Sequence, residues 1–463
     1  MLALAAVTLL YTSYSMPWYY MVAGMISVLV FFNFGYALSR TTSRVKIKRS
    51  IDFEKRIFWI AFVPRLLFTL LIYWIFMANY GNTFGFESGD ATYYNDLGQF
   101  VAGLIDQGNY HFYDEISKWS GNKDVADMGY GVYVGFLYWL LGNNILVVRL
   151  LKCVWSSLMV VLIYRLAKRN FGDQIARLAA ILCALWPNFW YYCGVHLKET
   201  EMVFLSVLFV EQADQMLRSK KFTTWKVVPI LLLAALLFTF RTPLGLVAIL
   251  ALLFAIVISS TKIISRGKKI IVGILALVLI GVTMGNRIEE QTRKLMESAN
   301  TEGQSQNMAW RSIRENGNAF AKYAGAAVFA PMILTIPFPT MAEPYAGQEL
   351  QELLNGGNFA KNIFSGFTIL ACIVLLLSGK WREHTLPLAF MLGYVVVLVM
   401  STFAQSERFH QPVMAFELMF AAYGISIVAG QKRYRRWCIY WCVLMFMAAI
   451  AWNWFKLAGR GLA

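Results

Sequence analysis

The sequence has 463 residues, a length that would allow two or three soluble domains. Its composition excludes that class, because 58% of the residues are hydrophobic, only 15% are charged, and the mean hydropathy is +0.54. The net charge of +16 would favour nucleic acid as the partner of a soluble protein. Here, however, the basic residues crowd short connections between apolar runs, at 39–56, 165–177, 218–226, 262–269, 380–384 and 431–436. The positive-inside rule assigns such connections to the cytoplasm. We therefore predict an all-α, multi-pass protein of the cell membrane that has no nucleic-acid partner.

The chain is predicted to have four parts in order. Residues 1–56 form an N-terminal hairpin, with arms at Met1–Tyr14 and Trp18–Leu38, and a basic cytoplasmic linker. Residues 57–286 form a transmembrane core with an outer loop at 80–143, residues 287–361 form a second outer loop with a re-entrant or interfacial hairpin, and residues 362–463 form C-terminal helices. Apolar runs of spanning length lie at 57–79, 144–164, 176–192, 199–217, 227–240, 243–261, 269–286, 362–379, 385–403, 412–430 and 437–455. The expected fold is a bundle of about 11–13 transmembrane helices.

The first outer loop carries the first candidate site residues. It contains the segment Glu87-Ser-Gly-Asp90-Ala-Thr-Tyr93-Tyr94 and is strongly acidic. From Tyr94 to Ile105, apolar residues recur at helical spacing, which predicts an amphipathic juxtamembrane helix. Asp90 is then either the N-cap of that helix or a general base at the lipid–water boundary, where partial desolvation tunes a carboxylate. Aromatic residues of this loop could also stack on a sugar.

A second group of candidates is cationic and lies at the predicted outer boundary of the membrane. Single cations there can be snorkelling side chains that contact lipid phosphates. Several at one depth favour a shared anionic ligand such as a lipid-linked phosphate, which arginine binds bidentately. The group comprises Arg149, Lys152, Lys198, Arg241 and Arg408, with His196, Glu199 and His410 beside them.

Other chemistries find little support in the sequence. It contains no P-loop, no dinucleotide-binding glycine motif and no zinc-protease motif. Asp124 and Asp127 could pair on a metal, but in a polar loop such a pair is more typical of a solvated surface. We therefore expect neither a metal nor a cofactor.

The order of these features resembles the polytopic glycosyltransferases of the GT-C superfamily, especially bacterial relatives of protein O-mannosyltransferases and lipid A aminoarabinose transferases. After the outer-loop Asp90, the segments that carry the resemblance are Val147-Val-Arg149-Leu-Leu-Lys152, Leu185-Trp-Pro187-Asn, Gly194-Val-His196-Leu-Lys198-Glu199-Thr200 and Arg408-Phe409-x-x-Pro412. Two features depart from the family pattern. Gly129-Tyr-Gly-Val replaces a proline-rich stretch, and Asp90 stands where the aminoarabinose transferases have paired acids.

The resemblance implies transfer of a sugar from a polyprenyl-phosphate donor to a glycan, lipid or protein acceptor on the outer, periplasmic or extracellular face. It implies Asp90 as the base and Lys198, Arg241, Arg408 and Arg149 as ligands of the donor phosphate. Substrate-binding roles would then fall to Glu87, Tyr93, Tyr94, His196, Glu199 and His410. Two alternatives remain open at this point. A lipid-linked oligosaccharide polymerase or ligase would also rely on outer arginines, whereas a transporter or flippase would favour inverted repeats and charges buried at mid-membrane, neither of which is evident in the sequence.

Overall fold

The computed structural model describes residues 29, 33–40, 50–85, 88–120, 128–219, 224–259, 357–400 and 407–458. Every regular element in these ranges is helical and none is a strand, which confirms the predicted all-α class. Most of the predicted N-terminal hairpin, the span at 269–286 and the outer loop at 287–361 lie outside the described residues.

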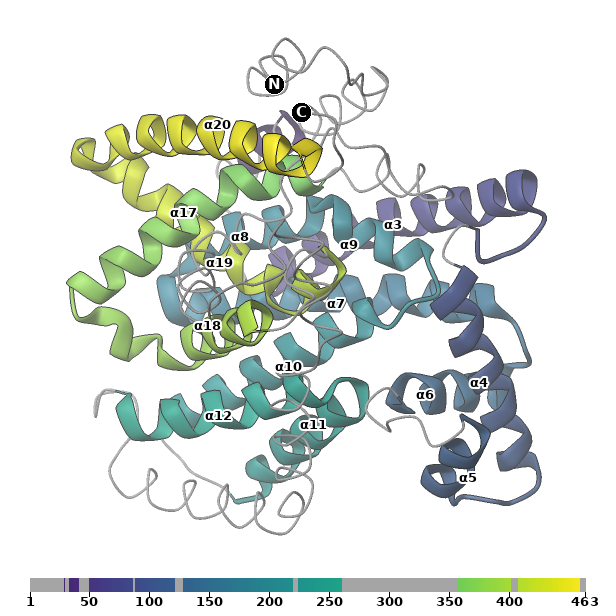
Figure 1. Cartoon of the computed structure of the whole chain (residues 1–463). Coiled ribbons are helices and arrows are strands. Elements are labelled where there is room, and N and C mark those ends of the chain that lie inside the picture. Colours follow the sequence, from purple (N-terminus) through teal and green to yellow (C-terminus); the bar gives the residue numbers. More distant parts are fainter. Residues whose placement is uncertain are drawn as a thin grey trace.

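From α3 to α12 and from α17 to α20 the described helices follow one another closely along the chain (Figure 1). The first half of the chain contains α3 (Ser50–Tyr80), α4 (Ser88–Asp106), α5 (Phe112–Trp119), α6 (Met128–Leu141), α7 (Ile145–Phe171), α8 (Asp173–Leu185), α9 (Pro187–Gly194), α10 (Glu199–Arg218), η2 (Thr224–Lys226), α11 (Val227–Phe240) and α12 (Thr242–Ile258). The second half contains α17 (Gly357–Leu377), η3 (Lys380–Glu383), α18 (Thr385–Met400), α19 (Glu407–Gly430), η5 (Lys432–Tyr434) and α20 (Arg435–Ala458).

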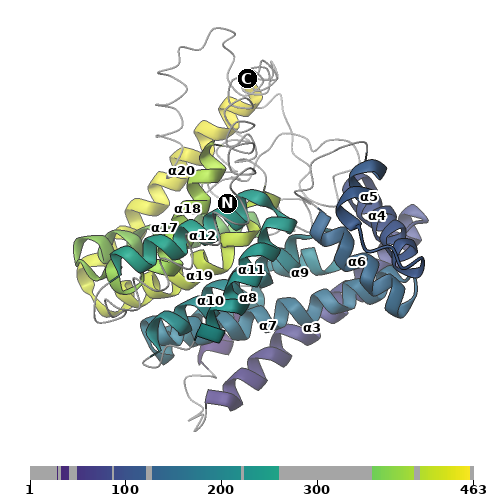
Figure 2. The same ribbon diagram turned by 90° about the horizontal axis from the view of Figure 1, so that it is seen from below.

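The apolar runs found in the sequence correspond to helices that pack side by side. Among the described helices, α3, α7 and α19 are long and apolar enough to cross a membrane, and α6, α11, α12, α17 and α18 are shorter apolar helices. The long helices α3 and α7 lie against each other, and α19 lies against α17 and α8 (Figure 2). Together these helices account for a multi-pass membrane protein.

Helix α10 occupies the centre of the bundle, and it is charged at both ends. Each of its four acidic residues forms an ion pair with a neighbouring helix or within α10. At its N-terminal end Glu199 pairs with Arg408, and Glu201 pairs with Lys152 at 3.4 Å. At its C-terminal end the acids Glu211 and Asp214 pair with Arg169 and Arg218. Pairing removes much of the cost of burying these carboxylates.

The predicted span at 176–192 is wrong as a single helix. The chain breaks at Trp186, where α8 ends, and Pro187 opens α9. A proline is tolerated in the first turn of a helix but disrupts its interior, because it lacks the N–H group that the interior needs. The break leaves the last carbonyl groups of α8 without helical partners.

Arg65, a fully buried residue in the middle of α3, supplies the missing donors. Its guanidinium donates to the carbonyl oxygens of Cys183 at 2.9 Å and Ala184 at 2.8 Å, and its Nε donates to Ser156 Oγ at 2.9 Å. A positive charge is also favourable at the negative end of the α8 dipole. No charge buried at mid-membrane is evident from the sequence, but Arg65 is a candidate for one, because it is fully buried in the middle of a helix long enough to cross a membrane. The hydrogen bonds of Arg65 identify it as a helix cap.

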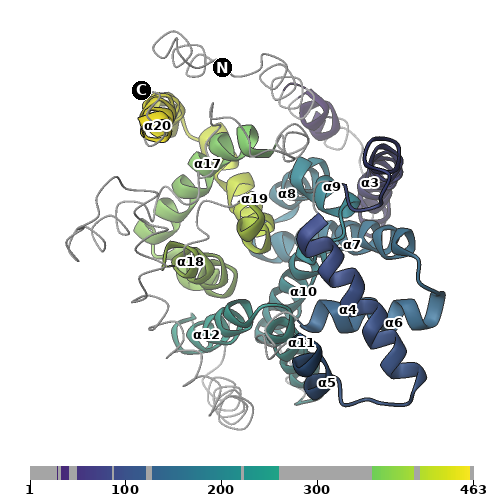
Figure 3. The same cartoon turned by 45° about the vertical axis from the view of Figure 1, so that its right-hand side comes forward.

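The segment predicted to be the first outer loop contains three helices, α4, α5 and α6, which lie together at one end of the bundle (Figures 1 and 2). The predicted amphipathic helix is confirmed as α4, and its apolar face is covered by α6, which crosses it (Figure 3). The crossing is close, since a Cβ at Gly135 would lie 2.5 Å from that of Val101, and a Cβ at Gly98 would lie 2.5 Å from a methyl group of Val134. Gly135 and Gly98 thus allow the backbones of α4 and α6 to pack closely, and this packing holds α4 against the rest of the bundle.

Candidate active site

A single arginine joins three helices that are far apart in the sequence. Arg408, in the first turn of α19, donates through Nη1 to the Asp90 carboxylate of α4 and through Nε to the Glu199 carboxylate of α10. The sequence placed Arg408 before a span beginning at Pro412, but α19 begins at Glu407, so both residues lie inside the helix. The structure thus brings three of the candidate residues into direct contact, and we refer to them as the Asp90–Arg408–Glu199 cluster.

The two acids of the cluster occupy similar positions on their helices. Glu199 is the first residue of α10, and Asp90 lies in the first turn of α4, two residues after its start at Ser88. Asp90 is therefore not the N-cap of α4, which was one of its two predicted roles. Negative charge is favoured at both places because the amide dipoles point their positive ends there. The dipole of α19 does not favour a cation such as Arg408 in its first turn. The ion pairs with the two carboxylates therefore hold Arg408 in place.

The acids differ in their access to solvent. The Glu199 side chain is 0% exposed, whereas the Asp90 side chain is 58% exposed. Only Asp90 can therefore meet a substrate hydroxyl without a rearrangement. Glu199 is better suited to orienting Arg408 from within the protein.

Two further predicted cations lie beside the cluster. Lys198 immediately precedes Glu199, and its Nζ donates to the carbonyl oxygen of Phe240 at 3.2 Å. Arg241 donates to Tyr394 Oη at 3.1 Å, and its guanidinium lies 4.3 Å from the ring centre of Phe409. The charges of Arg408, Arg241 and Lys198 all act on the Glu199 carboxylate. The arrangement therefore gathers three cations at the N-terminal end of α10.

Arg149 and Lys152 are both fully buried in α7 and face a different part of this end of the bundle. Arg149 donates to the carbonyl oxygen of Thr83 and thereby holds the turn that leads from α3 to α4. Lys152 donates to the carbonyl oxygen of Leu197 and pairs with Glu201. Neither cation contacts a member of the Asp90–Arg408–Glu199 cluster through a recorded bond, so their contacts support the backbone on either side of it.

His196 lies between these groups as a buried, neutral imidazole. Its ring is 5.7 Å from that of Tyr130 and 6.4 Å from that of Phe84. Burial, together with the charges of Lys152 and Arg149, holds the pKa of His196 well below its usual range. Neither ring nitrogen has a hydrogen-bond partner among the described residues. A neutral ring in this position can donate or accept a hydrogen bond but carries no charge to a phosphate.

The remaining residues predicted to bind substrate do not lie together. Tyr93 and Tyr94 lie on α4 one turn after Asp90, and the Tyr94 ring is 5.6 Å from Lys198 Nζ. His410 is fully buried on α19, where its Nδ1 is 2.6 Å from Lys361 Nζ of α17. Glu87 lies outside the described residues.

Sequence reasoning missed Lys361, Glu201 and Arg65. Each carried a usable signal, because an ionisable residue inside or at the edge of a long apolar run is costly and demands a partner. Lys361 stands one residue before the apolar run at 362–379, as Arg408 stands before its own. What the sequence lacks is the identity of the partner, which belongs to another helix in each case.

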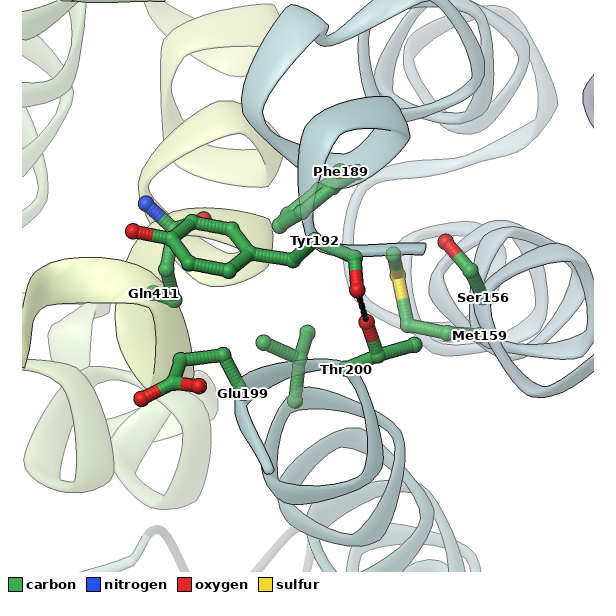
Figure 4. Close-up of a pocket in the computed structure, with 8 residues that line it drawn as sticks. Ser156, Met159, Phe189, Tyr192, Glu199, Thr200 and Gln411 are labelled. Carbon is green, nitrogen blue, oxygen red and sulfur yellow. Dashed lines mark hydrogen bonds between the residues drawn. The ribbon is translucent and has the colours of Figure 1, made fainter. Parts of the chain in front are cut away.

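A small cavity adjoins Glu199, as Figure 4 shows. Its volume is about 10 Å³, near the lower limit for one water molecule. Thr200 at its edge donates to the carbonyl oxygen of Tyr192 at 3.0 Å. The cavity is lined by Ser156, Met159, Phe189, Tyr192, Glu199, Thr200, Val203 and Gln411. It is too small for a sugar, so it is a packing feature behind the site rather than a substrate pocket.

The described residues contain no group of three or more side chains that could hold a metal ion. Asp124 and Asp127, the weak candidates from the sequence, lie outside them.

Comparison with known proteins identifies the class. Residues 132–284 match the family model of dolichyl-phosphate-mannose-protein mannosyltransferases, which covers about a third of the chain. The matched part includes Arg149, Lys198, Glu199 and Arg241 but neither Asp90 nor Arg408. No curated protein and no solved structure matches the chain. The family match and the all-helical, multi-pass architecture confirm the resemblance seen in the sequence and support a membrane glycosyltransferase of the GT-C type.

Proposed function

We propose that this enzyme transfers a sugar from a polyprenyl-phosphate donor to a hydroxyl-bearing acceptor at the outer face of the membrane. The observation that carries the proposal is the Asp90–Arg408–Glu199 cluster, in which a solvent-accessible acid lies next to a cation from another helix. Lys198 and Arg241 add positive charge at the same end of α10. An accessible base beside a group of cations suits attack by a hydroxyl and departure of a phosphate.

In this mechanism Asp90 takes the proton of the acceptor hydroxyl as its oxygen forms a bond to the anomeric carbon. The bond from that carbon to the phosphate oxygen breaks, and the phosphate keeps the electron pair. Attack from the side opposite the phosphate inverts the configuration of the anomeric carbon. Lys198, Arg241 and Arg408 stabilise the phosphate as it leaves, because preorganised cations act most strongly where charge accumulates.

Because Arg408 pairs with two acids, it can also control when Asp90 is available as a base. Its contact with Asp90 holds that carboxylate pointed toward the cations, where the donor phosphate would bind. When a phosphate arrives, Arg408 can exchange its bond to the exposed Asp90 for one to the phosphate and stay anchored on the buried Glu199. The exchange would free Asp90 to act as a base only when donor is present.

The test is donor binding by a pair of matched variants. Arg408→Ala alone would leave the buried Glu199 carboxylate without its partner and could unfold the protein. The double variant Glu199→Gln/Arg408→Ala removes both charges, and Glu199→Gln alone is its control. Loss of one charged phosphate contact corresponds to about 2–3 kcal/mol, so the double variant should bind a polyprenyl-phosphate sugar about 30- to 150-fold more weakly than its control. Equal affinities would remove Arg408 from the donor site.

A further inference from the structure

A series of aromatic rings leads from the site to the protein surface along α4 and α5. Beyond Tyr94, which lies against Lys198, the ring of Tyr93 is 5.6 Å from that of Tyr94 and 5.7 Å from that of Trp119. Trp119, the last residue of α5, is stacked on Phe100 of α4 at 5.5 Å with 20° between the ring planes. The rings are fixed by one another, so they form a preorganised surface.

The outer end of this series is open to solvent. Trp119 is 40% exposed and Tyr113, on the same helix, is 48% exposed, whereas Tyr94 at the inner end is 4% exposed. The apolar residues of α5 that secure it to α4, such as Ile116, point inward and are buried. Trp119 is thus not needed to close the small core between α4 and α5, and part of its ring is available to a ligand.

Charge decides which ligand fits. Between residues 88 and 119 the chain carries five carboxylates against one lysine, and Asp96, Asp106 and Asp114 are all exposed. Such a surface repels anionic lipid head groups and the phosphate of a donor. It suits a ligand that combines apolar C–H faces with hydroxyl groups, since aromatic rings cover the former and carboxylates accept hydrogen bonds from the latter. A saccharide without negative charge has both features.

We infer that the Tyr93–Trp119 surface binds the acceptor and that the acceptor is a neutral or amine-bearing saccharide. This inference rests on the proposed function and names the acceptor class that it leaves open. Asp90 lies one turn before Tyr93 on α4, so a saccharide seated on these rings extends toward the base and the cations. The exposed tryptophan then selects the acceptor, and a hydroxyl of the bound saccharide reaches the exposed Asp90.

The experiment uses the detergent-purified full chain and an array of immobilised oligosaccharides, neutral, amine-bearing and anionic, followed by titration with the best-bound soluble oligosaccharide. Trp119→Ala should weaken binding about tenfold or more, because the ring's apolar contact is lost. Trp119→Phe should restore part of the affinity. Trp139→Ala is the matched control, because Trp139 is a similarly exposed tryptophan of α6, at 45%, and its removal should leave binding unchanged.

Several results would overturn the inference. One is that no uncharged or amine-bearing saccharide binds; another is that Trp119→Ala and Trp139→Ala reduce binding equally. A third is that Trp119→Ala lowers only the binding of phosphatidylglycerol vesicles, which would make the surface a membrane contact. Because donor affinity is measured separately with the Arg408 variants, failure of the donor test with saccharide binding intact would count against the donor site and leave a saccharide-binding surface at Trp119.

Discussion

Asp90 and Glu199 both pair with Arg408, but only Asp90 is exposed. Neutralising Asp90 should therefore affect turnover far more than stability. Asp90 is exposed, so Asp90→Asn should change the free energy of unfolding in detergent by less than about 1 kcal/mol. An amide cannot take up the acceptor proton, so turnover should fall by roughly 10²- to 10⁴-fold. Both quantities can be followed on the purified enzyme, by thermal unfolding and by transfer from a polyprenyl-phosphate sugar.

Asp96 offers a control for Asp90 because it is an exposed acid further along the same helix, whereas Arg408 pairs with Asp90. Asp96→Asn should retain turnover within a few-fold. If Asp90→Asn retains it as well, the base is another group.

The sequence identified Asp90, Glu199 and Arg408 as candidates because charges at the edge of apolar runs are conspicuous. It could not show that they touch, because the contact joins residues more than 200 and 300 positions apart.

His384, in the connection between α17 and α18, predicts a pH dependence. Burial lowers the pKa of His384 to about 4, with smaller effects from the charges of Arg218 and Lys380. Its Nδ1 is 2.9 Å from Asn170 Oδ1, a bond that the neutral ring can donate. An unfolded histidine has a pKa near 6.5, so the unfolded chain binds the extra proton first, and stability is lost as the pH falls from about 6.5 to about 4.

The midpoint of thermal unfolding should therefore be lower at pH 4.5 than at pH 7.5. The variant His384→Gln keeps a donor for Asn170 but has no proton to gain, so its midpoint should fall less over the same interval. Identical pH profiles for the two proteins would show that other groups govern the acid sensitivity.

At the level of whole helices, hydrophobic periodicity predicted well where a helix follows from its own sequence. The predicted span at 227–240 matches α11 residue for residue, and α4 has the expected apolar face. The pattern failed at 176–192, because the run is mostly apolar on both sides of Pro187 and the break there is made tolerable by a residue of another helix, Arg65. Such compensation depends on tertiary contact, which a local pattern does not contain.

The α8–α9 break predicts a large effect of removing its cap. Arg65→Met should lower the free energy of unfolding on the order of 3 kcal/mol, because it leaves buried carbonyl groups of α8 without donors. Arg65→Lys keeps the charge but forms fewer hydrogen bonds. Its free energy of unfolding should therefore lie between that of Arg65→Met and that of the parent protein. Arg56, an exposed arginine on the same helix, serves as control, and Arg56→Met should cost no more than about 0.5 kcal/mol. Thermal or denaturant unfolding in detergent measures all three, and equal stability of Arg65→Met and the parent would refute the capping role.

The geometry of α10 relates these local features to the whole molecule. Its 20 residues correspond to a length of about 30 Å, close to the hydrocarbon thickness of a bilayer. Glu199, at one end, belongs to the candidate active site, whereas Asp214, near the other, pairs with Arg169 and Arg218. Glu199 and Asp214 are 15 residues apart, which is about 22 Å along the helix, so the two charged clusters lie toward opposite ends of a helix long enough to span a bilayer.

This separation, together with the basic connections, predicts which side each cluster faces. We expect Asp106, exposed at the end of α4, to lie outside the cell, and Trp225, 80% exposed beside the basic connection at 218–226, to lie in the cytoplasm. In a background in which the exposed Cys442 is replaced by serine, Asp106→Cys should react with an impermeant thiol reagent in intact cells or spheroplasts. Trp225→Cys should react only after permeabilisation, and the background protein shows the labelling due to other cysteines. Labelling of Trp225→Cys alone in intact cells would invert the orientation and place Asp90 in the cytoplasm, whereas labelling of both would show that α10 does not separate the two clusters across the membrane.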